Sequence, residues 1–390
     1  MRRGSDRICY LHFGPHKTGS TSIQAMLRRR AKDLGRIGIH VATTASSVER
    51  DHKWRQYAAS APESSRIRRI FPRAAAMMGQ AASLLPWPLP WMAGDDSVER
   101  DNHSHLGVRS NFDGHRRLDD SPDWKILSDD IAKHSGCVVI SGENIFRRIQ
   151  NPEHYDQIVE FFLGRGFRLT FIGYVRDQVG WINSHYAQHL KTFRSAIGFR
   201  RYVEQALQGR AFEFDAMFAN LLSDARVDFQ VVSFETAIGK GLERDFLDRV
   251  GGSAVAHAPR RVANANFGAK GAYVARTILK DHDGELDAVK GLRKALDNRL
   301  RNVAISRGWT QDPYMGFDED GAQEIREHFR AGNDDFAWRF FGRPWNEIAP
   351  PQSVSRSTFN MKSATDEDRC EVEDLVEELR GMISIQIAEL

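Results

Sequence analysis

The chain of 390 residues is long enough to bury a large hydrophobic core, organised as one enlarged domain or as two. Its 55 basic and 52 acidic side chains give a net charge of +3, which is too even for a protein whose partner is a nucleic acid. Three widely separated cysteines form neither a disulfide framework nor a metal cluster and suit a reducing compartment. The first apolar run is too short for a secretory signal, so the expected location is cytoplasmic.

The first diagnostic stretch, ICYLHFGPHKTGSTSIQAML, spans residues 8–27 and predicts a strand, a tight loop and a helix. The N-terminus of a helix attracts anions through its N–H groups and its dipole, so this loop is a candidate phosphate or sulfate site. Gly14 and Gly19 let the backbone approach an anion closely, and Lys17 adds a mobile positive charge. The alternative is a Ser/Thr-rich cap on an ordinary helix. The candidate binding residues of the loop are Gly14, Pro15, His16, Lys17, Thr18, Gly19, Ser20 and Thr21.

Residues 37–41 predict a second short strand, after which residues 43–125 interrupt the alternation of strands and helices. We expect this region to be a large helical and irregular insertion and a candidate lid over an acceptor. Within it, the segment 65–92 combines an amphipathic helix with a proline-rich end that carries Trp87 and Trp91. That segment packs on the core, grips an acceptor or lies on a membrane surface. The last of these would make the protein peripheral to the inner face of a membrane. Residues 95–123 are polar and predict a mobile surface loop.

From residue 137 onward, short buried strands alternate with helices. This alternation predicts an α/β fold, with a P-loop-like parallel sheet flanked by helices and ligands at the carboxyl ends of the strands. Residues 260–390 predict a mainly helical C-terminal part, and we expect a single domain over residues 1–390. The predicted strands are 137–140, 168–175 and 227–234, and the predicted helices are 152–163, 181–189, 242–250, 265–300, 319–331 and 366–387.

The second diagnostic stretch is YVRDQVGWINSHY, residues 174–186. Arg176 follows a predicted strand, and Ser184 lies two helical turns further on, on the same face. Because a guanidinium makes forked contacts to phosphate oxygens, the pair is a candidate phosphate site. The alternative is an ordinary arginine and serine on a surface helix.

The two stretches together resemble the sulfotransferases that use 3′-phosphoadenosine 5′-phosphosulfate (PAPS). The first loop has the order G-x-x-K-T-G-S-T, whereas a Walker A loop places its lysine after the second glycine. The resemblance implies that this loop wraps the 5′-phosphosulfate of the donor and that Arg176 and Ser184 bind its 3′-phosphate. Gln178 departs from the family, which commonly has proline there. Arg261 lies in a basic stretch that loosely resembles the family's basic C-terminal loop.

The activity that this resemblance implies is transfer of a sulfuryl group from PAPS to an acceptor hydroxyl, with a carbohydrate as the expected acceptor. Glu143 is the candidate catalytic base, because the glycan-acting branch of the family has a glutamate after a central strand; otherwise it caps a helix or pairs with an arginine. Lys17 would stabilise charge on the bridging oxygen, and His16 is a weaker candidate for acceptor contact. No metal is expected, since His12 and His16 lack a third ligand at a fitting spacing.

Two other functions are compatible with these residues. A nucleotide-dependent phosphotransferase would use the same kind of loop, but it needs magnesium and a Walker lysine, and Lys17 stands at a different position. A non-catalytic glycan- or membrane-binding protein could keep the fold and would bind the desulfated nucleotide, PAP, weakly or not at all.

Overall fold

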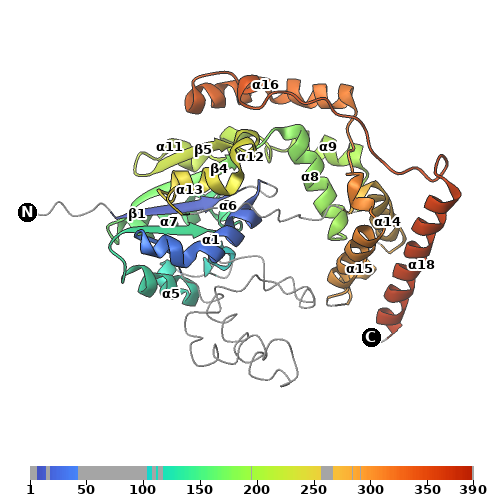
Figure 1. Ribbon diagram of the computed structural model, residues 1–390, viewed down its shortest axis with the longest axis horizontal. Coiled ribbons are helices and arrows are strands. Elements are labelled where there is room, and N and C mark those ends of the chain that lie inside the picture. The colour runs from blue at the N-terminus through green and yellow to red at the C-terminus, as the bar shows by residue number, and fades with distance from the viewer. Residues whose placement is uncertain are drawn as a thin grey trace, which may run out of the picture. The chain divides into compact units, whose positions relative to one another are not determined.

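The structure is a computed structural model, and its chain divides into two compact units, each described here by itself (Figure 1). The sheet unit comprises Met1–Val175 and Phe218–Arg260, and the helical unit comprises Arg176–Met217 and Arg261–Leu390. The residues that the structure describes are 7–14, 18–42, 103–107, 111–112, 117–194, 196–255, 267–282, 284–289 and 291–388.

Five parallel strands form the sheet, in the order β2-β3-β1-β4-β5. The inner strands are buried on both faces of the sheet, as is usual for a parallel sheet. Their mostly apolar sequences supply the buried side chains of both faces. The α/β class and the parallel sheet flanked by helices, which the alternation of elements predicts, are therefore confirmed. The strands are β1 (Ile8–Phe13), β2 (Ile39–Val41), β3 (Cys137–Ser141), β4 (Arg168–Val175) and β5 (Asp228–Ser233).

The helices α1 (Ser20–Arg36) and α7 (Pro152–Leu163) cover opposite faces of the sheet. Side chains alternate along each strand, so Ile172 of β4 joins the apolar cluster under α1, whereas Phe171 stacks on Tyr155 of α7 with ring centroids 6.1 Å apart. The chain crosses from β1 to β2 in one direction and from β3 to β4 in the other. Right-handed crossovers in opposite directions place their helices on opposite faces.

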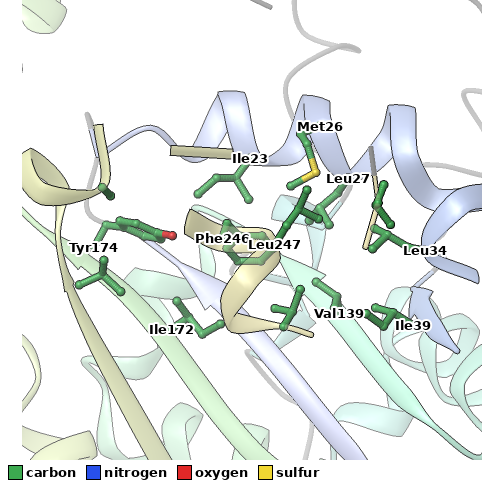
Figure 2. Packing of buried hydrophobic residues seen from close by; sticks show 14 residues of the cluster. Ile23, Met26, Leu27, Leu34, Ile39, Val139, Ile172, Tyr174, Phe246 and Leu247 are labelled. Atoms are coloured by element: carbon green, nitrogen blue, oxygen red, sulfur yellow. The ribbon is translucent and has the colours of Figure 1, made fainter. Parts of the chain in front are cut away.

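The core under α1 is a continuous apolar cluster (Figure 2). α1 contributes one face at helical spacing, as its sequence predicts, and the sheet and α13 (Leu242–Arg249) supply the opposite wall. At the edge of the cluster the hydroxyl of Tyr174 donates to Asp245 over 2.9 Å, so this buried phenol is satisfied. The cluster includes Ile23, Met26, Leu27, Leu34, Ile39, Val139, Ile172, Tyr174, Phe246 and Leu247.

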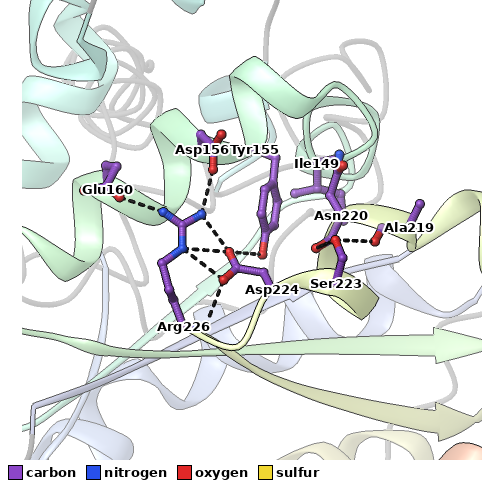
Figure 3. A network of polar contacts seen from close by, with 9 residues as sticks. All are labelled: Ile149, Tyr155, Asp156, Glu160, Ala219, Asn220, Ser223, Asp224 and Arg226. Carbon is purple, nitrogen blue, oxygen red and sulfur yellow. Dashed lines mark hydrogen bonds and ion pairs between the residues drawn. The ribbon is translucent and has the colours of Figure 1, made fainter.

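An ion-pair network attaches the segment before β5 to α7 (Figure 3). Arg226 donates to Asp224, Asp156 and Glu160, and the hydroxyl of Tyr155 donates to Asp224 over 2.9 Å. Hydrogen bonds from Arg226 lower the pKa of Asp224 to about 2. Isolated surface pairs contribute little, but here one guanidinium holds carboxylates from two segments, which fixes β5 against the helix.

Part of the region 43–125 is described and belongs to the sheet unit. α5 begins at Pro122, a residue suited to the first turn of a helix, within the bounds predicted for the insertion. Residues 43–102, with the predicted lid helix, the membrane-surface segment 65–92, Trp87 and Trp91, lie outside the described residues. The remaining elements of this unit are η3 (Ser104–Gly107), η5 (Leu118–Asp120), α5 (Pro122–Ile131), α6 (Ile145–Ile149), α11 (Ala219–Ser223) and α12 (Phe234–Lys240).

The helical unit contains the mainly helical C-terminal part that the sequence predicts, with two differences in the extent of helices. The helix predicted over residues 319–331 continues to Phe341. The helix predicted over residues 265–300 is two helices, because Gly284 and Gly291 each adopt a φ of +91°, which an α-helix does not accommodate. Within the described ranges, no helix has the length and apolarity needed to cross a bilayer. The elements are α8 (Gln178–Lys191), α9 (Phe199–Gln208), α10 (Phe214–Met217), α14 (Gly268–Asp281), η6 (Glu285–Asp287), α15 (Leu292–Ser306), η7 (Trp309–Gln311), α16 (Glu319–Phe341), α17 (Trp345–Ile348) and α18 (Asp366–Ala388).

We expect Leu247→Ala to lower the free energy of unfolding by about 2–5 kcal/mol, because it opens a cavity in the cluster under α1. Urea unfolding measures this change. Ile238→Ala is the matched control, since it removes the same kind of side chain from a position that is 56% exposed and should change stability by less than about 0.5 kcal/mol. Equal effects of the two substitutions would contradict the assignment of Leu247 to the core.

Candidate functional site

The turn into α1 depends on a glycine. Gly19 is the N-cap residue and has a φ of +85°, and a Cβ at this position would come within 2.2 Å of Leu242 Cδ2. No side-chain hydrogen bond caps this end of α1, whose first residues are Ser20 and Thr21. Because the first N–H groups of a helix carry partial positive charge, this end of α1 favours an anion.

Two hydroxyl groups of the loop converge on Gly14. A Cβ there would lie 2.6 Å from Thr18 Oγ1 and 2.7 Å from Ser20 Oγ, so any other residue would displace these hydroxyls. Ser20 Oγ is buried and has no hydrogen-bond partner among the described residues. A buried hydroxyl without a partner is costly, so this oxygen requires a partner from the undescribed part of the loop or from a ligand. Residues 15–17 (Pro15, His16 and Lys17) lie outside the described residues, and their roles stay predictions.

Glu143 and this loop follow two strands that are neighbours in the sheet. β3 is the neighbour of β1, with Ser141 in register with His12, and the N–H of Gly142 donates to the carbonyl of His12 over 3.0 Å. Glu143 therefore follows β3 at the edge of the sheet where Gly14 follows β1, and its side chain is half-buried. Glu143 follows a strand, as the sequence predicts, and the structure adds that this strand is the neighbour of β1.

The order of the strands makes this edge the expected ligand site. After β1 the chain continues into α1 on one face of the sheet, and after the adjacent β3 it continues through α6 to α7 on the other face. In open α/β sheets, ligands bind outside the carboxyl ends of such adjacent strands, where the connections diverge. Topology and loop chemistry thus indicate the same place.

A buried histidine lies in β1, close to this edge of the sheet. His12 is fully buried; its Nδ1 lies 2.7 Å from Ser141 Oγ, and its Nε2 has no partner among the described residues. The rings of Tyr174 and Phe246 lie edge-on to it, with centroids 5.6 and 5.3 Å away. Burial lowers the pKa of His12 to about 3, so its imidazole is neutral at neutral pH.

A second buried histidine corrects one expectation. His103 lies in the segment 95–123 that the sequence predicts as a mobile surface loop, yet it is fully buried. Its Nε2 lies 2.7 Å from the carbonyl of Ala42, and its Nδ1 accepts from the N–H of Ser141 over 3.0 Å. This one imidazole joins the ends of β2 and β3, so it holds the backbone that precedes Glu143. Because the hydrogen-bond partners of His103 are backbone groups far away in the chain, the sequence around it does not indicate that it is buried.

In the helical unit, Arg176 and Ser184 are in contact, as the sequence pattern suggests. The Nη1 of Arg176 donates to Ser184 Oγ over 3.1 Å. A Cβ at Gly180, between them on α8, would approach the guanidinium to 3.0 Å, so the glycine gives the arginine room to lie along the helix. The Asp177 side chain caps α8 by accepting from the N–H of Val179 over 3.1 Å. The guanidinium is therefore held on one face of α8.

Gln178, the departure from the family pattern, has a structural role in the same unit. Its amide and that of Asn333 on α16 form two reciprocal hydrogen bonds of 2.8 Å each, and both side chains are buried. The nitrogen of Gln178 also donates to the carbonyl of Phe212 over 3.2 Å. A proline at this position could make none of these contacts.

The loose resemblance around residue 260 gains no support from the described residues. Lys270, in that stretch, pairs with Asp368 and with Glu371, the latter over 2.8 Å, so its ammonium group belongs to the packing of α14 against α18. Arg261 lies outside the described residues. No family model, curated protein or solved structure matches this chain.

Acidification should destabilise the fold through His12. Because its folded-state pKa lies below its ordinary value of 6.5, the unfolded chain binds the proton first as the pH falls. The stability that neutral His12 contributes is complete above pH 6.5 and is lost from there toward pH 3, at about 1.4 kcal/mol per pH unit. Urea unfolding measures the free energy of unfolding at pH 7 and at pH 5. The loss between the two pH values should be about 2 kcal/mol smaller in His12→Gln than in the parent protein. Equal losses in the two proteins would contradict this.

Proposed function

We propose that this protein is a PAPS-dependent sulfotransferase that transfers a sulfuryl group to an acceptor hydroxyl, with a carbohydrate as the acceptor. The observation that carries the proposal is the loop between β1 and α1. There Gly14 meets the hydroxyls of Thr18 and Ser20 beside a helix N-terminus without a side-chain cap. The order of lysine and glycine in this loop is the order of the PAPS-using family.

The donor's phosphosulfate end carries negative charge on both its phosphate and its sulfate. Backbone N–H groups at the start of α1, the hydroxyls of Thr18 and Ser20, and the ammonium of Lys17 supply donors of the kind this end needs. The buried oxygen of Ser20 has no partner among the described residues, which supports the assignment, since a bound oxyanion gives it an acceptor.

The donor's 3′-phosphate is assigned to Arg176 and Ser184. A guanidinium offers five N–H donors in a fixed plane, the arrangement that matches phosphate oxygens, and one of them donates to Ser184. The contact with Ser184 orients the guanidinium in advance, and the serine hydroxyl can itself donate to the same phosphate. Pre-orientation lowers the entropic cost of binding.

The chemistry follows from these assignments. The acceptor oxygen attacks the sulfur atom, a new sulfur–oxygen bond forms, and the bond between sulfur and the bridging oxygen of the donor breaks. Glu143 takes the proton that the acceptor hydroxyl loses. PAP leaves with the negative charge on its phosphate, where Lys17 offsets the charge that develops as the bond breaks.

Calorimetry with PAP, and separately with ATP and magnesium, tests the donor assignment. A sulfotransferase should bind PAP without magnesium and prefer it to ATP. Preference for magnesium–ATP would favour the phosphotransferase instead, and binding of neither nucleotide would favour a non-catalytic protein on this fold. The position of Lys17 before Gly19 is the feature that disfavours the phosphotransferase.

We expect Arg176→Ala to weaken PAP binding about 10- to 150-fold, the loss for hydrogen bonds to a charged group. Binding of adenosine 5′-phosphate, which has no 3′-phosphate, should hardly change. The control is Arg200→Ala, since the Arg200 side chain is 95% exposed in the same unit. If Arg176→Ala weakened both nucleotides equally, the residue would bind another part of the ligand.

We expect Glu143→Gln to keep PAP affinity and to lower sulfuryl transfer roughly 100-fold or more, because glutamine cannot accept the proton. A coupled assay of PAP release with a panel of sugar acceptors measures the rate. Glu153→Gln, on the exposed first turn of α7, is the control and should be as active as the parent. Unchanged turnover in Glu143→Gln would transfer the role of base to another residue.

A further inference from the structure

Three side chains from separate segments of the sheet unit meet at the edge strand β2. His40 lies in β2, Asp130 lies in the last turn of α5, and His134 lies in the turn before β3. Their ligand atoms all lie within 4.8 Å of one another. Among the described residues, this is the group of histidine, cysteine and carboxylate side chains that is close enough to hold a metal ion. The sequence gives no motif for this cluster, because 90 residues separate His40 from Asp130.

The cluster has the donors of a transition-metal site. His40 Nε2 lies 2.6 Å from Asp130 Oδ2, and the imidazole of His134 stacks on that of His40 with centroids 3.5 Å apart and planes 17° apart. Two imidazole nitrogens and one carboxylate oxygen suit Zn²⁺ and its neighbours in the first transition row. Mg²⁺ and Ca²⁺ prefer sites made of oxygen alone.

The charges around the cluster act on a bound cation in both directions. The last carbonyls of α5 carry partial negative charge, which attracts a cation, whereas Lys133 and the guanidinium of Arg7, which donates to the carbonyls of Ile131 and His134, oppose one.

The backbone around the cluster is held in place by hydrogen bonds. Arg7 donates to the carbonyls of Ile131 and His134 over 2.9 and 3.0 Å, and also to the carbonyl of Arg165 over 2.8 Å. β2 is fixed against β3, with His40 in register with Val138. The backbone of the ligands is consequently ordered before an ion binds, which lowers the cost of binding. The two stacked imidazoles have to turn so that a nitrogen of each points at the ion.

We propose that His40, Asp130 and His134 bind one divalent transition-metal ion, with Zn²⁺ as the best fit. The ion takes the place of the proton between His40 and Asp130, and that proton moves from Nε2 to Nδ1 of the same imidazole, which stays neutral. In tetrahedral geometry with Zn–N and Zn–O distances of about 2.0–2.2 Å, two donors lie about 3.3 Å apart. His40 and Asp130 therefore need only a small separation from their present 2.6 Å, and water completes the coordination.

The position of the cluster assigns the ion a structural role. His134 precedes β3 and Glu143 follows it, so the metal site and the proposed catalytic edge lie at opposite ends of one strand. A bound ion joins the edge strand β2 to α5 and to the start of β3. It should therefore raise the stability of the fold while the chemistry of transfer stays the same, and this site stands independently of the proposed function.

Calorimetry of the full chain with Zn²⁺, after removal of metal with a chelator, tests the proposal. We expect one equivalent of Zn²⁺ to bind and to raise the melting temperature, whereas Mg²⁺ should do neither. Asp130→Asn and His134→Gln should each weaken Zn²⁺ binding at least tenfold, since loss even of a second-shell partner costs 10- to 100-fold. In both variants, the rise in melting temperature that Zn²⁺ causes should vanish.

His282→Ala is the matched control, because His282 and Glu285 form a histidine–carboxylate pair of 2.8 Å on the helical unit. Its Zn²⁺ affinity should equal that of the parent. Asp130→Asn keeps the shape of the side chain, so it provides the test even where a histidine variant fails to fold. Absence of Zn²⁺ binding to the parent, or equal affinity in the parent and Asp130→Asn, would overturn the proposal.

Discussion

The hydrogen bonding of β1 between two parallel neighbours is the constraint on which the sheet unit depends. His12 is in register with Ser141 of β3 on one side and with Ile172 of β4 on the other. A shift of one residue along either ladder would turn every side chain of the strand to the other face. The buried rings under α1 and the fully buried His12 leave no room for such a shift. Every group that follows a strand, including Gly14 and Glu143, takes its position from this register.

The sequence predicts the parts of the fold that apolar patterning controls. Runs such as that of β4, and the helical spacing of the buried residues in α1, carry their own signal. Patterning could not predict where polar side chains find partners. His103 is buried because the ends of β2 and β3 offer it a carbonyl and an N–H, and both lie far from it in the sequence. The break of the helix predicted over residues 265–300 depends on the backbone conformation of two glycines, which composition alone does not fix.

The candidate site, like the fold, has features that the sequence predicts and features that it does not. The need for glycine at positions 14 and 19 and the contact of Arg176 with Ser184 follow from local spacing, and the structure contains them. Phosphosulfate binding, phosphate binding and the role of Glu143 as a base stay proposals. The lack of a partner for the Ser20 oxygen among the described residues and the pairing of His12 with Ser141 were not predictable, because each depends on how distant segments pack. The same holds for the cluster of His40, Asp130 and His134, which exists only once β2 pairs with β3.

The paired amides of Gln178 and Asn333 have a consequence for how this chain can diverge. Each side chain uses the donor and the acceptor of the other in a buried setting. Replacement of Gln178 alone takes both bonds from Asn333, and replacement of Asn333 alone leaves Gln178 only its bond to the carbonyl of Phe212. Positions 178 and 333 should therefore covary among homologues. A relative with proline at the first position, as in the family that the motif resembles, should carry an apolar residue at the second. The polar contact between α8 and α16 would then be replaced by an apolar one, and the intermediate with a single change would be the unstable step between the two.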